Sequence, residues 1–116
     1  MIFFRRDARV SEIDGCHGGF GKLNCASLLS EAWKQAGGRF QFVHDDLLEP
    51  GTTIAEHLHE GDEELYIVLE GSGIALLDGE RYEVGPGDAY ICRSGHTHGI
   101  ENGNAPLRMI VVSTRV

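Results

Sequence analysis

The sequence has 116 residues and a mass of 12.7 kDa, which is the size of one domain. A hydrophobic share of 41% with 24% charged residues is typical of a globular chain that buries a core. The net charge of -8 argues against nucleic acid as a partner, and no apolar run has the ~18 residues of a membrane span. The cysteines Cys16, Cys25 and Cys92 form no Cys-x-x-Cys pair and no secretory leader is evident. We therefore expect a cytoplasmic protein with reduced thiols.

The first 38 residues carry the weakest pattern. We expect residues 1–21 to be irregular. Residues 22–29 alternate partly, as a strand does, but residues 25–36 could instead form a short helix ended by Gly37-Gly38. The two alternatives stay open at this point. We predict that residues 1–38 form an irregular or partly helical N-terminal extension that packs on the remaining domain or on a dimer partner.

Residues 39–116 predict a β-structure. A strand that starts at Phe40 ends at Glu49-Pro50-Gly51, and Asp78-Gly79 between two strand-like runs is a strong hairpin signal. Further strands are expected at 52–59, 64–69, 74–77, 80–84, 89–92, 96–101 and 107–113. Short strands with a turn every 8–12 residues are typical of an all-β sandwich or barrel. We assign its walls and core to Phe40, Phe42, Leu76, Ile91, Ile110 and Val112.

Two His-x-His pairs carry the chemistry of the sequence. His57 and His59 project from the same face of one strand, since side chains alternate along a strand. Glu63 and Glu64 follow a sharp turn, and His98 lies in a later segment. Three neutral imidazoles and one carboxylate suit Zn, Fe, Mn, Ni or Cu. The alternative is a solvated histidine cluster, which we favour less because Gly, His and Glu recur at ordered spacings.

These spacings resemble the two motifs of the cupin superfamily. The first is Gly51, five residues, His57-Leu58-His59, four residues, Glu64, six residues and Gly71. The second is Gly87, five residues, Arg93-Ser94-Gly95, two residues, His98, three residues and Asn102. Arg93 stands where the family usually has proline, which alters a turn and leaves the ligand set intact. The motifs span residues 51–102, and the flanking strands extend the match to roughly 39–113, as in a small single-domain cupin.

The resemblance implies a double-stranded β-helix, or jelly-roll barrel. It also implies one divalent transition metal ion (Fe, Mn, Ni or Zn) held by His57, His59, Glu64 and His98, with positions open for water or substrate. The fold hosts dioxygenases, decarboxylases, isomerases, lyases and binding proteins, so it does not name the reaction.

Three further residues are candidates near the metal. Tyr66 shares the face of Glu64 and could bond substrate or metal-bound water, or be a buried tyrosine satisfied by the backbone. His96 could be a general base, although a surface turn histidine is the simpler interpretation. Arg93 could bind an anionic substrate or remain solvated. Glu63 should point away from the site.

The sequence favours a metalloenzyme that acts on a small oxygen-donor molecule, such as a keto acid, hydroxy acid or sugar derivative. An isomerase, dioxygenase, decarboxylase or lyase would fit. The alternative is a non-catalytic, metal-dependent sensor of a sugar or acid. We also expect a homodimer, because the N-terminal third holds more apolar side chains than a small barrel can cover: Phe3, Phe4, Phe20, Leu28, Leu29 and Trp33.

Overall fold

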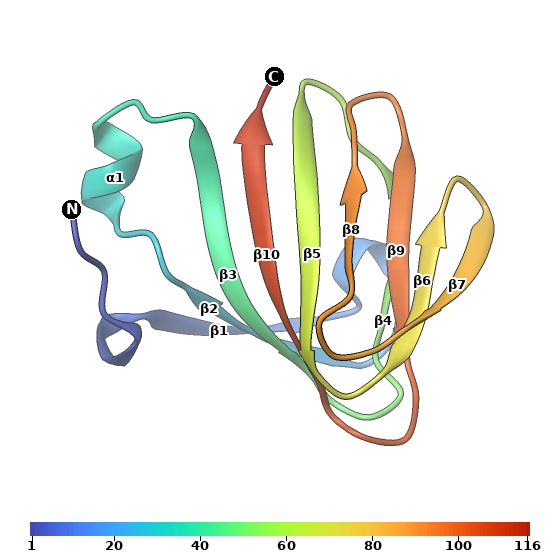
Figure 1. Cartoon of the computed structure of the whole chain (residues 1–116). Helices are drawn as coiled ribbons and strands as arrows, with labels where there is room; N and C mark the ends of the chain where they lie inside the picture. The colour runs from blue at the N-terminus through green and yellow to red at the C-terminus, as the bar shows by residue number, and fades with distance from the viewer.

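The computed structural model describes residues 1–116, apart from the side chain of Lys34. Two antiparallel sheets face one another (Figure 1). One has the strand order β1 (Arg9–Asp14), β2 (Lys22–Ser27), β3 (Phe40–Leu48), β10 (Leu107–Arg115), β5 (Asp62–Glu70), β8 (Ala89–Cys92). The other has the order β4 (Thr53–Leu58), β9 (Thr97–Asn102), β6 (Gly73–Leu77), β7 (Glu80–Val84). The expected all-β jelly-roll barrel is confirmed.

The strands after residue 39 begin and end within a few residues of the expected positions. The hairpin between β6 and β7 shows the local reason. Asp78 and Gly79 have φ angles of 47° and 80°, the left-handed pair that a tight two-residue turn requires. Asp78 accepts this conformation because a short polar side chain tolerates it, and Gly79 has no Cβ to clash.

The core lies between the sheets and is built by alternate residues of each strand. Tyr66 and Val68 of β5, Met109 and Val111 of β10 and Ile100 of β9 are each at most 3% exposed. Burying such a side chain contributes roughly 1.5–3 kcal/mol.

Most of the predicted core residues are wrong, because their neighbours along the strand point inward in their place. Phe42 packs against the core, but Phe40 and Ile91 are each 49% exposed. The predicted Leu76, Ile110 and Val112 are only partly buried. Their strand neighbours, Ala75, Met109 and Val111 among them, point inward instead. Strands with apolar residues on both faces do not reveal which face is the inner one.

The N-terminal residues continue the larger sheet. β1 pairs with β2 and β2 with β3, so the expectation of an irregular segment 1–21 misses the strand Arg9–Asp14. Every residue of β1 is exposed, which removes the alternation by which a strand is recognised. Both alternatives for 22–36 hold in part, because strand Lys22–Ser27 is followed by the short helix α1 (Glu31–Gln35).

Side-chain bonds tie this N-terminal part to the barrel. Arg5, in the 3₁₀ turn η1 (Arg5–Asp7), donates from Nε to Asp45 Oδ2 at 3.0 Å. Trp33 of α1 donates from Nε1 to the carbonyl oxygen of Phe40 at 2.8 Å. Among the helices described, none is long and apolar enough to cross a membrane.

Candidate metal centre

Three strands bring the histidines and one glutamate together inside the barrel. His57 lies on β4, His59 directly follows it, Glu64 lies on β5 and His98 on β9. One ligand atom from each residue lies within 4.8 Å of all the others. The Nε2 atom of His59 is 3.1 Å from that of His57 and 2.9 Å from that of His98. Glu64 approaches with its oxygens 3.5 Å from His59 Nε2 and 3.7 Å from His98 Nε2.

A bulge in β4 aims His57 at the centre. Ile54 pairs with Ile100 and His57 pairs with His98, so β4 has one residue more than β9 between these pairs. Such bulges re-aim side chains and often lie beside functional sites. Gly99 makes room for the bulge, because a Cβ there would lie 2.5 Å from the carbonyl oxygen of Ile54.

The ring nitrogens that face away from the centre orient two of the ligands. His57 donates from Nδ1 to the carbonyl oxygen of Ala55 at 2.8 Å. His59 Nδ1 lies 3.1 Å from Oδ1 of Asp62, so this carboxylate orients the ring. Because His57 donates from Nδ1, its Nε2 is left as an acceptor, and it points at Nε2 of His59 across 3.1 Å. Three converging imidazole nitrogens and one carboxylate are donors that suit a cation, so the residues fit a bound metal.

Burial shifts the pKa values of three ligand residues, and each shift bears on metal binding. The pKa of His98 is lowered to about 3, chiefly because its side chain is buried and also because His57 and His59 lie close by. Burial also lowers the pKa of His57. The imidazoles of His57 and His98 are therefore neutral at neutral pH. Burial raises the pKa of Glu64, because its negative charge is costly without a cation nearby.

The register of β5 decides between the two adjacent glutamates. Glu64 is 7% exposed and belongs to the group, whereas Glu63 lies on the opposite face of β5. Tyr66 follows two residues later on the inner face and is 2% exposed. Its ring centroid lies 4.5 Å from that of His98, and its hydroxyl donates a hydrogen bond to Glu64.

His17 lies beside the ligands, a position that no sequence pattern predicts. It belongs to the 3₁₀ turn η2 (Cys16–Gly18), which packs on β4. Its ring stacks on that of His57, with centroids 3.5 Å apart. Asp62, the carboxylate beside His59, was likewise missed as a functional residue. Its signal is weak, because it is one of several acids in the Glu60–Glu64 turn.

A cavity of about 180 Å³ lies inside the barrel next to this centre. Glu64, Tyr66 and His17 line one side of it. Cys25, His44 and Asp46 line it as well, from β2 and β3. The remaining lining residues are mostly apolar: Ile13, Cys16, Leu23, Phe42, Ile54 and Val111.

Two of the candidate residues lie elsewhere. His96 precedes β9, is exposed, and places Nδ1 2.8 Å from Asp78 Oδ2 at the tip of the β6–β7 hairpin. Arg93 is exposed in the turn after β8. Neither is among the described residues that line the cavity. His96 is thus an exposed histidine of a turn, because Gly95, with φ at 90°, turns the chain before β9 begins at Thr97.

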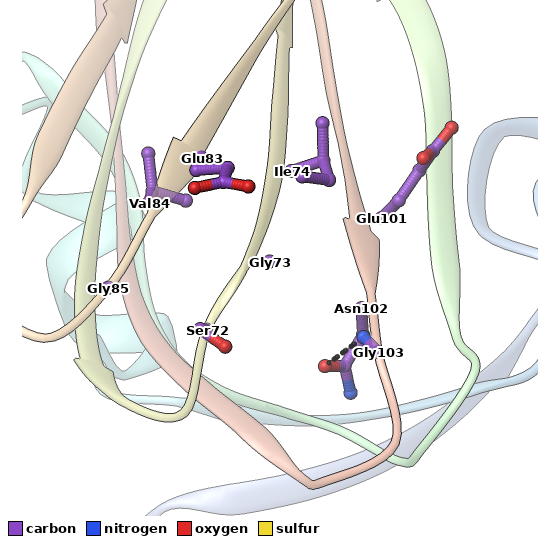
Figure 2. Close-up of a pocket in the computed structure, with 9 residues that line it drawn as sticks. All are labelled: Ser72, Gly73, Ile74, Glu83, Val84, Gly85, Glu101, Asn102 and Gly103. Carbon is purple, nitrogen blue, oxygen red and sulfur yellow. Dashed lines mark hydrogen bonds between the residues drawn. The ribbon is translucent and has the colours of Figure 1, made fainter.

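A larger hollow, of about 570 Å³, lies at the other end of the smaller sheet (Figure 2). It is formed around the start of β6, the end of β7 and the end of β9, with Glu83 and Glu101 as its charged residues. Glu101 is already paired with Arg81, at 2.6 Å and 2.9 Å. No histidine or cysteine lines this hollow among the residues described.

Comparison with models of known protein families shows to which family the chain belongs. The family model of the cupin domain matches residues 46–113, which is more than half of the chain and includes both motifs in full. The chain is a member of the cupin family. The paired glycine, histidine and glutamate spacings of the sequence thus carry the family assignment correctly.

Several known proteins resemble this chain over most or all of its length. An oxalate-binding protein of Thermotoga maritima is 35% identical over 97% of this chain and 92% of its own. A crystal structure from Thermotoga maritima, described as a predicted oxalate decarboxylase, superimposes with a TM-score of 0.90 at 29% identity, covering 100% of both chains. The L-ectoine synthase of Bordetella parapertussis is 35% identical over 68% of this chain, which spans 60% of that enzyme.

Proposed function

We propose that this cupin holds one divalent transition metal ion at His57, His59, Glu64 and His98 and acts as an enzyme on a small chelating acid. The observation that carries the proposal is the convergence of three imidazole Nε2 atoms and one carboxylate beside an internal cavity. A bound metal would supply a Lewis acid that polarises the oxygen donors of such a ligand.

The size of the cavity supports a small acid over a sugar derivative. The 180 Å³ available is below the ~300–1,000 Å³ of pockets for drug-sized molecules. Cavities of about 150 Å³ hold benzene, which has as many non-hydrogen atoms as oxalate. The two Thermotoga maritima relatives, whose names mention oxalate binding and decarboxylation, point to the same class of ligand. Oxalate is therefore the first probe.

Tyr66 is the side chain to which the proposal assigns the positioning of Glu64. Burial and the neighbouring Glu64 raise its pKa well above its ordinary value, so its hydroxyl stays protonated and donates to Glu64. It thereby holds the carboxylate in place, and the same hydroxyl borders the cavity where a ligand would sit. His96 and Arg93 take no part in the proposal, because both are exposed and outside the cavity lining described.

The second candidate function is metal-dependent binding without turnover. It is favoured by the name of the Thermotoga maritima relative, an oxalate-binding protein. The lining supports it too, because lysine and arginine are absent from the cavity residues described. Such a wall leaves only the metal and neutral donors to hold an anion.

The test uses the full chain, stripped of metal and reloaded separately with Mn²⁺, Fe²⁺, Ni²⁺ or Zn²⁺. Oxalate binding is measured by calorimetry, and turnover by release of carbon dioxide and formate. We expect oxalate to bind a loaded form at least tenfold more tightly than the metal-free chain, with turnover in one of the forms. Glu64→Gln should abolish both effects and Glu63→Gln neither. Tight binding without turnover in every form would favour the binding protein, and equal binding with and without metal would refute both functions.

A further inference from the structure

A second group of metal-binding side chains lies on the opposite wall of the cavity. Cys25, His44 and Asp46 each offer one ligand atom within 4.8 Å of the others. Cys25 of β2 and Asp46 of β3 are direct partners across the two strands, and His44 lies two residues before Asp46. All three side chains therefore project from the same face of the sheet into the barrel.

Asp46 supplies an independent observation that points to a missing ligand. Its side chain is 3% exposed, and its Oδ1 atom is buried without a hydrogen-bond partner. The thiol of Cys25, itself 6% exposed, donates a hydrogen bond to the same carboxylate. A buried carboxylate with an unsatisfied oxygen is costly unless a cation or a donor completes it. Asp46 is also one of the residues that line the cavity.

A second hollow borders this group on its other side. A cleft of about 810 Å³ lies between the N-terminal segment and the strands β1 and β2. Cys25 and His44 line both this cleft and the internal cavity. The wall that carries these donors is therefore thin, and only a few side chains separate it from the outside of the barrel.

We propose that Cys25, His44 and Asp46 form a second metal site, separate from the His57–His98 centre, which takes Zn²⁺ or a cation of similar softness. One sulfur, one nitrogen and one oxygen are the donors that zinc prefers. A thiolate and a carboxylate carry two negative charges, so a divalent cation leaves the buried site without net charge. The fourth position opens into the cavity, where a water molecule or a ligand oxygen completes a tetrahedron. This inference does not depend on the proposed function.

Cobalt distinguishes the two sites because only the second contains sulfur. The metal-free full chain is titrated with Co²⁺ under argon in the presence of a phosphine reductant, and ultraviolet absorption and bound metal are recorded. Wild type should bind two equivalents of Co²⁺, one of which produces thiolate-to-cobalt charge transfer in the near ultraviolet. Cys25→Ser should lose this absorption and one equivalent. Glu64→Gln should keep the absorption and weaken only the other equivalent, so each site fails visibly by itself.

Matched cysteine variants are the controls. Cys92→Ser removes a fully buried thiol that donates to the His96 carbonyl oxygen outside the cavity, and the absorption should survive. Cys16→Ser removes the other thiol of the cavity wall, and the absorption should survive there too. Should Cys25→Ser not fold, Asp46→Asn keeps the shape of the site and should weaken the second equivalent at least tenfold. Wild type that binds Co²⁺ without the absorption, or absorption that persists in Cys25→Ser or is lost in Cys16→Ser, would overturn the proposal.

Discussion

The imidazole of His17 lies parallel to that of His57, with ring centroids 3.5 Å apart and planes 6° apart. His17 reaches this position in a left-handed conformation, with φ at 53° and ψ at 33°, that costs a non-glycine residue roughly 1–3 kcal/mol. The turn is held there by β4, because Phe20 and Thr53 exchange hydrogen bonds of 2.7 Å and 2.8 Å. Gly19 packs so closely that a Cβ would overlap the carbonyl oxygen of Thr53.

The stacking predicts that His17 sustains metal affinity at the expense of stability. His17→Gly should relieve the strained backbone and raise the free energy of unfolding of the metal-free chain by about 1 kcal/mol. It should weaken metal binding roughly tenfold, because the ring of His57 loses the partner that orients it. Chelator competition measures the affinity and thermal unfolding measures the stability. His17→Phe, which keeps a stacking ring, should retain most of the affinity; equal affinity in the glycine variant would contradict the role.

The two adjacent glutamates should differ sharply. Glu64→Gln removes the carboxylate that faces three imidazoles and should lower metal affinity by about 10²-fold or more. Glu63→Gln changes a side chain on the opposite face of β5 and should leave the metal content unchanged. Elemental analysis after reconstitution compares the two. A greater loss in the Glu63 variant would mean that β5 is shifted by one residue, which would also turn Tyr66 outward.

The hydrogen bonds of Asp45 contribute to the free energy of unfolding, and we expect this contribution to be lost in acid. Arg108 donates two hydrogen bonds of 2.9 Å to its carboxylate, which lowers the pKa of Asp45 below its ordinary value, and Arg5 adds a third at 3.0 Å. The carboxylate of Asp45 takes up a proton at a higher pH in the unfolded chain than in the folded chain. The stabilisation is therefore complete above about pH 4 and is lost as the pH falls through the folded-state pKa. Asp45→Asn should cost about 1 kcal/mol at pH 7, allowing for solvent around Arg108, and less near pH 3.

Urea unfolding at several pH values measures this difference. Glu70→Gln is the matched control, because Glu70 lies 3.5 Å from the same arginine but is 70% exposed. Its substitution should change stability little at any pH. A cost for Asp45→Asn that is the same at pH 7 and pH 3 would rule out ionisation of Asp45 as the cause.

The homodimer remains a prediction, and the structure suggests a surface for it. An apolar row crosses the outer face of the larger sheet, where Val43 pairs with Val112, Val112 with Leu65 and Leu65 with Ile91. Ile91 is 49% exposed, although it is large and apolar. We expect light scattering at low micromolar concentration to give about twice the mass of one chain. Ile91→Lys should yield monomers, whereas a monomeric wild type at high concentration would exclude the dimer.

Local signals account for the parts of the fold that sequence predicts well. Asp78-Gly79 predicts a two-residue turn, because few other residue pairs adopt its left-handed conformation. The strands on either side of the turn can then be placed from it. The His57, His59, Glu64 and His98 set depends on the two-residue period of strands and on spacings within two motifs, so it too can be read along the chain. The strand Arg9–Asp14 could not, because its stability comes from pairing with β2 and its own side chains are all exposed.

The sequence alone therefore determined the all-β class, the family and the residues of the His/Glu group, since each depends on near neighbours in the chain. Only the tertiary structure decided which face of each strand points inward, as Ile91 and Phe40 demonstrate, because apolar residues occur on both faces. It also decided that His17 stacks on His57 and that Cys25 faces Asp46. These contacts join segments far apart in sequence: the first forms because η2 packs on β4, and the second because β2 pairs with β3 in one sheet.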